Sequence, residues 1–222
     1  MSEFVEFAKI ARLSRDVVVT EKIDGTNAQV FITLPTADID DELVIARNMS
    51  GAHDPTSGYV MLAGSRNHYL TPKDDNFGFA RWVGEHASEL FDLGEGRHFG
   101  EWWGSGIQRG YGLTKGEKRF SLFNVARWSD DRDAVKFPVA RPDCCHVVPV
   151  LYRGSFDSFM GHCPDILDHL HLTGSHASPG FMKPEGIVIY HTAGNVLFKK
   201  TLEKDEEPKS QARSKPRAEV VS

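Results

Sequence analysis

The segment VVVTEKIDGTNAQVFITL, residues 17–34, places a charged turn between two apolar runs. The runs VVV and AQVFITL have the β-branched and aromatic composition of strands, whereas EKIDGTN between them is polar and contains a glycine. Lys22 stands in this turn with Glu21 before it and Asp24 after it. A lysine that only faced water would need neither acid, so the turn is the first candidate for a functional site.

The composition is that of an ordinary globular protein with one sizeable core. The chain has 222 residues, of which 40% are hydrophobic and 26% charged, and its formal net charge is -5. Because the chain is not a polycation, contact with nucleic acid requires a local basic patch. The N-terminus lacks the apolar stretch of a signal peptide, and no apolar run approaches the roughly 18 residues of a membrane span. We therefore expect a cytoplasmic, intracellular protein of cellular or phage origin, without membrane contact.

Hydrophobic patterning predicts strands over most of the chain and two helices. The predicted strands cover residues 15–24, 27–34, 42–49, 58–67, 97–106, 119–128, 146–154, 185–191 and 195–202. Helical spacing of apolar residues predicts helices over 76–91 and 155–172, the second interrupted by Pro164. Strands joined mostly by hairpins and long loops favour an α+β fold with largely antiparallel sheets.

The predicted elements end near residue 202. Residues 203–222 are polar, contain proline and show no apolar period, with acids first and bases after. This composition is typical of a disordered tail. We therefore expect one folded domain over residues 1–202 and a charged, disordered tail over 203–222.

Polar clusters follow the ends of several predicted strands. EKIDG, GSRN, FGEWWG and PEGIVIY supply a lysine, an arginine and several carboxylates, and LFKK in the last strand adds two lysines. Phosphoryl or nucleotidyl transfer needs these groups, because carboxylates hold a divalent metal, cations hold phosphates and a nucleophile attacks phosphorus. The chain has no Walker loop, kinase motif set, G-x-S-x-G elbow or H-E-x-x-H motif.

In order, EKIDGTN, GSRN, FGEWWG, FSLFNV, EGIVIY and LFKK resemble the motifs of the covalent nucleotidyltransferase superfamily of ATP-dependent ligases and capping enzymes. The first block, E-K-x-[DH]-G-[ST]-N, is most similar to the RNA ligase 2-like branch. The resemblance covers about residues 17–202, nearly the whole predicted domain. It implies an ATP-grasp-like nucleotidyltransferase domain of α+β class, with mostly antiparallel sheets around a nucleotide groove.

The first motif carries the nucleophile that the resemblance implies. Lys22 would take AMP as a lysyl phosphoramidate, and Glu21 would lie next to the adenine. Asp24, Gly25 and Asn27 would complete the turn around the ribose and phosphate.

The later motifs supply the remaining roles that the resemblance implies. Arg66 would contact the ribose or a nucleic-acid phosphate, Glu101 would hold the ribose or a metal, and Phe123 would stack on the adenine. Glu185 would bind the catalytic metal. Lys199, together with Lys200, would reach the α-phosphate. Because adjacent residues of a strand point to opposite faces, we expect only one of the two lysines to face the nucleotide, and we favour Lys199.

The implied activity is that of an ATP-dependent RNA ligase or a minimal ligase adenylyltransferase using Mg²⁺ or Mn²⁺. Lys22 would attack ATP, AMP would pass to a 5′-phosphate end of RNA, and a 3′-hydroxyl end would displace AMP. Attack requires the neutral amine, and neighbouring acids favour the charged one. We therefore expect adenylylation to be strictly metal-dependent. The alternatives are a GTP-using capping-type enzyme, a DNA ligase fragment, and a non-catalytic nucleic-acid-binding remnant.

Three features depart from the family pattern. Members of the branch usually have Phe-Asp where this chain has Phe123-Asn124, which leaves a metal or ribose role for Asn124 open. The last motif is usually Lys-x-Lys, whereas Lys199 and Lys200 are adjacent. Ligases of this superfamily usually carry a second domain after the last motif. We therefore expect either weak binding of nucleic acid or a partner protein in place of that domain.

Two further clusters have competing interpretations. The residues Cys144, Cys145, His146, His162, Cys163, His169 and His171 fit no C-x-x-C zinc spacing, so a zinc site is disfavoured. The glycine-rich segment 104–119 carries Arg109, Lys115, Lys118 and Arg119. It is either a mobile basic loop over RNA phosphates or a solvated connection.

Overall fold

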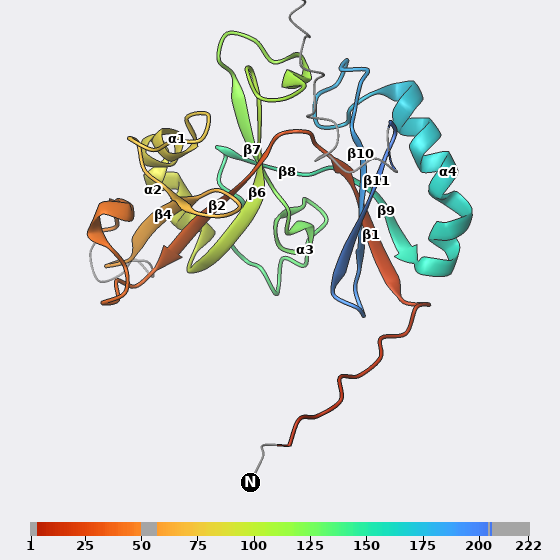
Figure 1. The fold of residues 1–222 in the computed structure, drawn as a ribbon, viewed down its shortest axis with the longest axis horizontal. Helices are drawn as coiled ribbons and strands as arrows, with labels where there is room; N and C mark the ends of the chain where they lie inside the picture. Colours follow the sequence, from red (N-terminus) through yellow and green to blue (C-terminus); the bar gives the residue numbers. More distant parts are fainter. Residues whose placement is uncertain (1–3, 50–56, 204, 206–222) are drawn as a thin grey trace, which may run out of the picture.

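The computed structural model describes residues 4–49, 57–203 and 205. Its strands form two sheets, one with the order β11-β10-β1-β9 and a larger one with the order β3-β4-β2-β6-β7-β8, in which β5 pairs with β4 (Figure 1). Within the described residues, every strand pair is antiparallel except β7 with β8. The predicted α+β class with largely antiparallel sheets is therefore confirmed.

The elements have the following bounds. The strands are β1 Asp16–Lys22, β2 Thr26–Thr33, β3 Val44–Arg47, β4 Val60–Gly64, β5 Tyr69–Leu70, β6 Gly96–Gly104, β7 Lys118–Leu122, β8 Cys145–Val147, β9 Val150–Ser155, β10 Gly186–His191 and β11 Val196–Thr201. The α-helices are α1 Phe79–Glu85, α2 Ala87–Leu90, α3 Val125–Trp128 and α4 Phe156–Thr173.

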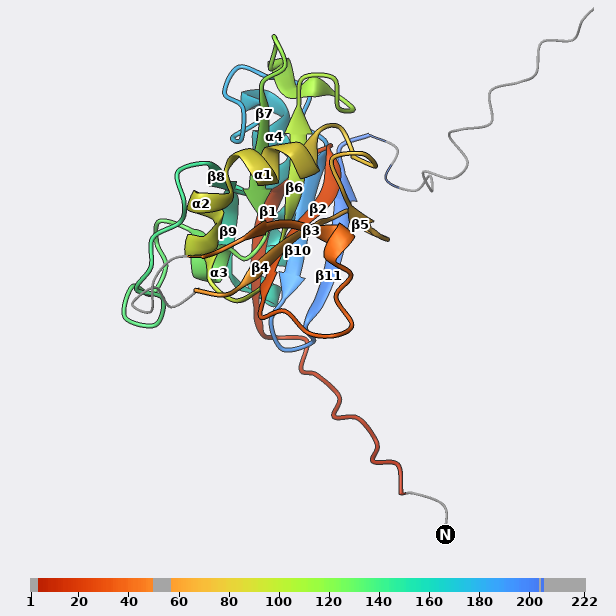
Figure 2. The same cartoon turned by 90° about the vertical axis from the view of Figure 1, so that its left-hand side faces the viewer.

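Each sheet buries one face under helices. Apolar residues of β2, β6 and β7, among them Val30, Trp102 and Phe120, pack with Phe79 and Val83 of α1. Figure 2 shows α1 and α2 in front of this larger sheet. The smaller sheet buries side chains of β1 and β10 against α4, on the other side of the molecule (Figure 1). The two faces that helices cover are therefore committed to core packing.

The chain passes between the sheets at two places. β1 belongs to the smaller sheet and β2 to the larger one, so residues 23–25 form a crossover instead of a hairpin turn. Ile23 anchors this crossover in a buried cluster with Trp103, Tyr111 and Val148. The second passage lies between β8 and β9, where Val148 donates its backbone N–H to Leu122 of the larger sheet.

Two predicted strands are wrong in extent. The strand expected over 119–128 ends at Leu122, because the Asn124 side chain accepts from the Arg127 N–H at 3.1 Å and caps the short helix α3. The strand expected over 146–154 divides at Pro149, which has no N–H to donate to a ladder, into β8 and β9 of different sheets.

The predicted helices differ in detail. The helix expected over 76–91 breaks at His86, whose backbone (φ -108°, ψ 15°) leaves the helical region, so α1 and α2 are separate. The second helix, α4, is instead continuous through Pro164, and the Ser155 side chain caps its first turn. The short strand β5 was not expected from the sequence.

The predicted tail lies largely outside the described residues, which omit 204 and 206–222. Asp205 is described and accepts from the backbone N–H of Thr201 at 2.8 Å. Among the helices that the structure describes, none is both long and apolar enough to cross a membrane.

The buried histidine of β6 gives the fold a predictable acid sensitivity. Burial lowers the pKa of His98 to about 4, although its ring nitrogen lies 2.9 Å from the Gly94 carbonyl oxygen. Since the unfolded pKa is about 6.5, this contribution to stability is complete above pH 6.5. It is lost as the pH falls towards 4, because only the unfolded chain takes up the proton, at a cost of about 3 kcal/mol.

We therefore expect the free energy of unfolding to decline less between pH 7 and pH 4 in His98→Gln than in the wild type. Denaturant titrations at several pH values measure both declines. Equal pH dependence in the two proteins would contradict the assignment.

Candidate active site

A lysine and a carboxylate from distant parts of the chain meet where the two sheets join. Lys22 ends β1 and pairs in register with Gly186, the first residue of β10, so Glu185 arrives directly beside it. The Lys22 Nζ atom lies 2.5 Å from Glu185 Oε2, with the side chains 19% and 5% exposed. Such a short contact between nearly buried charges is a strong local constraint.

A second carboxylate, Glu101 of β6, holds the polar end of the crossover. Its two oxygens accept from the backbone N–H of Gly25 at 3.1 Å and from Asn27 Nδ2 at 3.0 Å. Asn27 in turn accepts from Arg66 Nε at 2.8 Å. Arg66, Asn27, Glu101 and Gly25 therefore form one hydrogen-bonded chain.

The charges of Lys22 and Glu185 affect the ionisation of Glu101. Burial raises the pKa of Glu101 to about 7, while the positive charge of Lys22 and the hydrogen bonds from Gly25 and Asn27 oppose the rise. The negative charge of Glu185 reinforces it. Lys22, Glu101 and Glu185 thus belong to one electrostatic site.

The register of the smaller sheet distinguishes the two lysines of β11. Thr20, Val188 and Lys199 lie opposite one another across β1, β10 and β11. Because side chains alternate along a strand, Lys22 shares this face with Lys199. This arrangement puts Lys199, and not Lys200, on the face that carries Lys22.

The other face of the same sheet has a supporting role. Glu21, Ile187 and Lys200 lie opposite one another on the face against which α4 packs. Glu21 is buried, and burial raises its pKa, although Oε2 accepts from the N–H groups of His176 and Ala177 at 2.8 and 2.9 Å. The Glu21 side chain therefore holds the loop after α4 and lies on the face of the sheet opposite Lys22. Its expected place next to an adenine stays a prediction.

Phe123 lies on the Glu101 side of the larger sheet. Its N–H donates to the Phe99 carbonyl at 2.9 Å and extends the ladder beyond β7. Ser121, two residues earlier, pairs with Glu101, so the Phe123 ring shares that face. Phe123 is 41% exposed, which leaves its ring open to contact with a planar ligand.

Two residues of the glycine-rich segment reach the lysine turn, and sequence reasoning missed this connection. Tyr111 is fully buried, and its hydroxyl accepts from the Asp24 N–H at 3.0 Å. Arg109 Nε lies 3.2 Å from Asp24 Oδ2. The apolar residues Ile107, Tyr111 and Leu113 within this glycine-rich segment are the sequence signal that the loop packs inward.

The donor set fits a divalent cation that is shared with a substrate. Glu101 and Glu185 supply carboxylate oxygens, and Mg²⁺ is usually held by one or two carboxylates together with phosphates. Across the described residues, no three His, Cys, Asp or Glu side chains are grouped to hold a metal by themselves. The cysteines Cys144, Cys145 and Cys163 form no disulfides.

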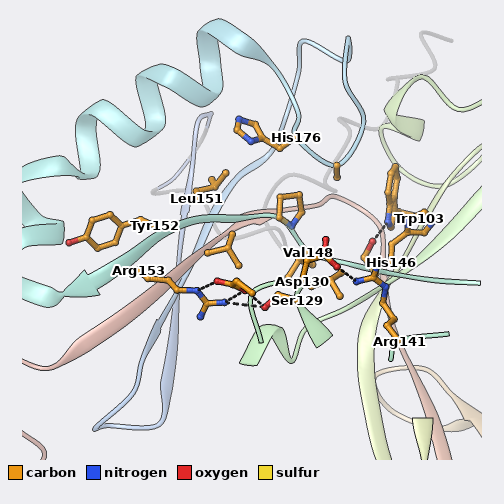
Figure 3. Close-up of a pocket in the computed structure, with 16 residues that line it drawn as sticks. Trp103, Ser129, Asp130, Arg141, His146, Val148, Leu151, Tyr152, Arg153 and His176 are labelled. Carbon is orange, nitrogen blue, oxygen red and sulfur yellow. Dashed lines mark hydrogen bonds and ion pairs between the residues drawn. The ribbon is translucent and has the colours of Figure 1, made fainter. Parts of the chain in front are cut away.

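A separate polar cavity of about 640 Å³ lies along the segment 147–153 (Figure 3). Arg153 pairs there with Asp131 at 3.2 Å and Arg141 with Asp130 at 3.7 Å. Lys22, Glu101 and Glu185 do not line it. This cavity is therefore distinct from the site around Lys22.

Comparisons with known proteins agree with this arrangement. The model of the RNA ligase family matches residues 15–201. A solved Naegleria gruberi RNA ligase variant with ATP and Mn is 19% identical with a TM-score of 0.52, and covers 88% of this chain and 52% of that one. Another such variant is 18% identical with a TM-score of 0.53, and covers 86% and 51%. At these identities the likeness shows the fold alone, and the chain spans about half the length of these structures. No curated protein matches.

The two antiparallel-rich sheets, joined beside a lysine and its carboxylate, define a nucleotidyltransferase domain like that of RNA ligases. The family match over residues 15–201 makes the assignment specific: the chain belongs to the RNA ligase family. The resemblance inferred from the sequence motifs is confirmed.

The close packing at Gly25 predicts that no side chain fits there. A Cβ atom at this position would lie 2.4 Å from the Trp102 carbonyl oxygen and 2.8 Å from Trp103 Cβ. We expect Gly25→Ala to lower the free energy of unfolding by about 1–3 kcal/mol, because backbone atoms must move.

Gly161→Ala is the matched control, since a Cβ there, in the exposed face of α4, would meet nothing within 4 Å. Its expected effect is neutral or stabilising by up to about 1 kcal/mol. Chemical denaturation of both variants measures the difference, and a Gly25→Ala protein as stable as Gly161→Ala would refute the packing argument.

Proposed function

We propose that this chain is an ATP-dependent RNA ligase whose Lys22 forms a lysyl-AMP intermediate. The observation that carries the proposal is the 2.5 Å contact between Lys22 Nζ and Glu185 Oε2 beside Glu101. Membership of the RNA ligase family and the likeness to ligase structures that contain ATP and Mn support it.

In the first step, Lys22 Nζ attacks the α-phosphorus of ATP. A phosphorus–nitrogen bond forms, the bond to the bridging oxygen breaks, and pyrophosphate leaves. The amine must first lose a proton, and a divalent cation on the nearby carboxylates, together with Lys199, would favour the neutral amine, because nearby positive charge disfavours the ammonium form. A divalent cation held by Glu185 and Glu101 would supply positive charge for the phosphate oxygens.

The remaining groups of the site would hold the nucleotide. Arg66, Asn27 and Glu101 present hydrogen-bonding groups suited to ribose hydroxyls, and they already order one another. The exposed Phe123 ring would stack on the adenine. Lys199, on the Lys22 face, would contact the α-phosphate and offset its developing charge.

The later steps act on RNA ends. A 5′-phosphate oxygen attacks the lysyl-AMP phosphorus, which breaks the phosphorus–nitrogen bond and gives a 5′-5′ adenylylated strand. A 3′-hydroxyl then attacks the 5′-phosphorus and releases AMP. RNA with a 5′-phosphate and a 3′-hydroxyl is therefore the proposed substrate.

Labelled ATP tests the first step. Incubation of the wild type with α-labelled ATP and Mg²⁺ or Mn²⁺ is expected to label the protein, and Lys22→Ala is expected to remain unlabelled, because it lacks the nucleophile. EDTA is expected to abolish labelling. Absence of label on the wild type, or equal label on both proteins, would overturn the proposal. A parallel reaction with labelled GTP identifies a capping-type enzyme.

The two lysines of β11 provide a second test with an internal control. We expect Lys199→Ala to slow labelling by about tenfold or more, since it removes a charge on the nucleophile's side. Lys200→Ala is expected to retain most of the rate, because Lys200 lies on the face of the sheet opposite Lys22. Its Nζ atom lies 3.2 Å from Asp205 Oδ2. Initial labelling rates measure both, and the reverse order would contradict the assignment.

A further inference from the structure

Arg109 connects the two segments that bring Lys22 and Glu185 together. Its Nε atom lies 3.2 Å from Asp24 Oδ2, two residues after Lys22. Its Nη1 atom donates to the carbonyl oxygens of Lys183 and Pro184 at 3.0 and 3.3 Å, directly before Glu185. One guanidinium group therefore spans both sides of the Lys22–Glu185 pair.

The setting of this contact differs from that of a surface ion pair. The Arg109 and Asp24 side chains are 29% and 15% exposed, whereas Arg153 and Asp131, also 3.2 Å apart, are 36% and 62% exposed. A partly buried, charge-assisted contact constrains geometry more than an exposed one, which water screens.

The loop that carries Arg109 is anchored independently of its side chain. Tyr111 is fully buried and packs against Trp103 and Phe181, with ring centroids 5.4 and 4.5 Å apart. The Ser178 hydroxyl also donates to the Tyr111 carbonyl at 2.7 Å. The guanidinium also lies 3.9 Å from the exposed Glu203 carboxylate, from Nη2 to Oε2. Removal of the guanidinium should therefore leave the loop in place and release the segments that it contacts.

We propose that Arg109 is a positioning residue for lysine adenylylation, which holds Asp24 and the loop segment before Glu185 so that Lys22 and Glu185 face each other. This inference rests on the proposed function. The planar fork of arginine reaches a carboxylate and two carbonyls at once, and the single ammonium of lysine does not. The alternative interpretation, a basic loop that binds RNA phosphates, assigns Arg109 to steps that involve RNA.

Lysine adenylylation measured without RNA separates the two interpretations. We expect Arg109→Ala to reduce the maximal labelling rate by at least about tenfold, because misplacement of the reacting groups slows the chemical step. The ATP concentration that gives half the maximal rate is expected to change little. Arg109→Lys is expected to restore only a small part of the rate. Arg153→Ala, which removes the exposed pair, is expected to label as the wild type does.

A double variant tests whether Arg109 acts through Asp24. If it does, Arg109→Ala combined with Asp24→Asn should be no slower than the slower single variant, since coupled residues show non-additive effects. Thermal unfolding of each variant establishes that it is folded. If Arg109→Ala does not fold, the maximal labelling rate of Arg109→Lys tests the inference in its place.

An unchanged maximal rate in folded Arg109→Ala, or multiplied effects in the double variant, would overturn the inference while lysyl-AMP formation by the wild type stands. A wild type that takes no label would instead overturn the proposed function, and this inference with it.

Discussion

The arrangement of the site depends on the contact between Lys22 and Glu185, which lie 163 positions apart in the sequence. The contact requires β10 to align beside β1 in one register, with Gly186 opposite Lys22. A shift of one residue would move every side chain of β10 to the other face, and with it the core residues that pack on α4. Packing of the smaller sheet therefore fixes the position of the carboxylate.

The crossover from β1 to β2 then brings the larger sheet to the same point. Ile23 is buried between the sheets, and Gly25 lies so close to Trp102 and Trp103 that no Cβ fits. This close approach lets Glu101 accept from the crossover backbone, and it places a second carboxylate near Lys22. Two carboxylates and one lysine in a nearly buried site are costly unless further charges or ligands complete them. The arrangement is consequently suited to a substrate that carries phosphates and a cation.

Much of this was predictable from the sequence, and the failures have physical causes. Motif order predicted that Lys22, Glu101 and Glu185 belong to one site, and the structure brings these three side chains together. Strand bounds failed at Asn124, which caps a helix, and at Pro149, where the chain changes sheet. In both cases one residue's hydrogen bonding overrides the apolar pattern around it. Alternation along a strand predicted that Lys199 and Lys200 would separate, but only the register with β10 shows which lysine shares the Lys22 face.

The glycine-rich segment shows why a side chain's partners cannot be read from charge alone. Arg109, Lys115, Lys118 and Arg119 are alike in sequence, and a basic loop was a reasonable expectation for all four. Tyr111 turns part of the segment inward, and this burial brings Arg109 to Asp24 while Arg119 pairs with Glu117. Asp24, one of the acids expected to disfavour a neutral Lys22, is thus paired with the guanidinium of Arg109. Arg109 lies 85 positions from Asp24 in the sequence. From the sequence alone, a metal was expected to offset the negative charge near Lys22.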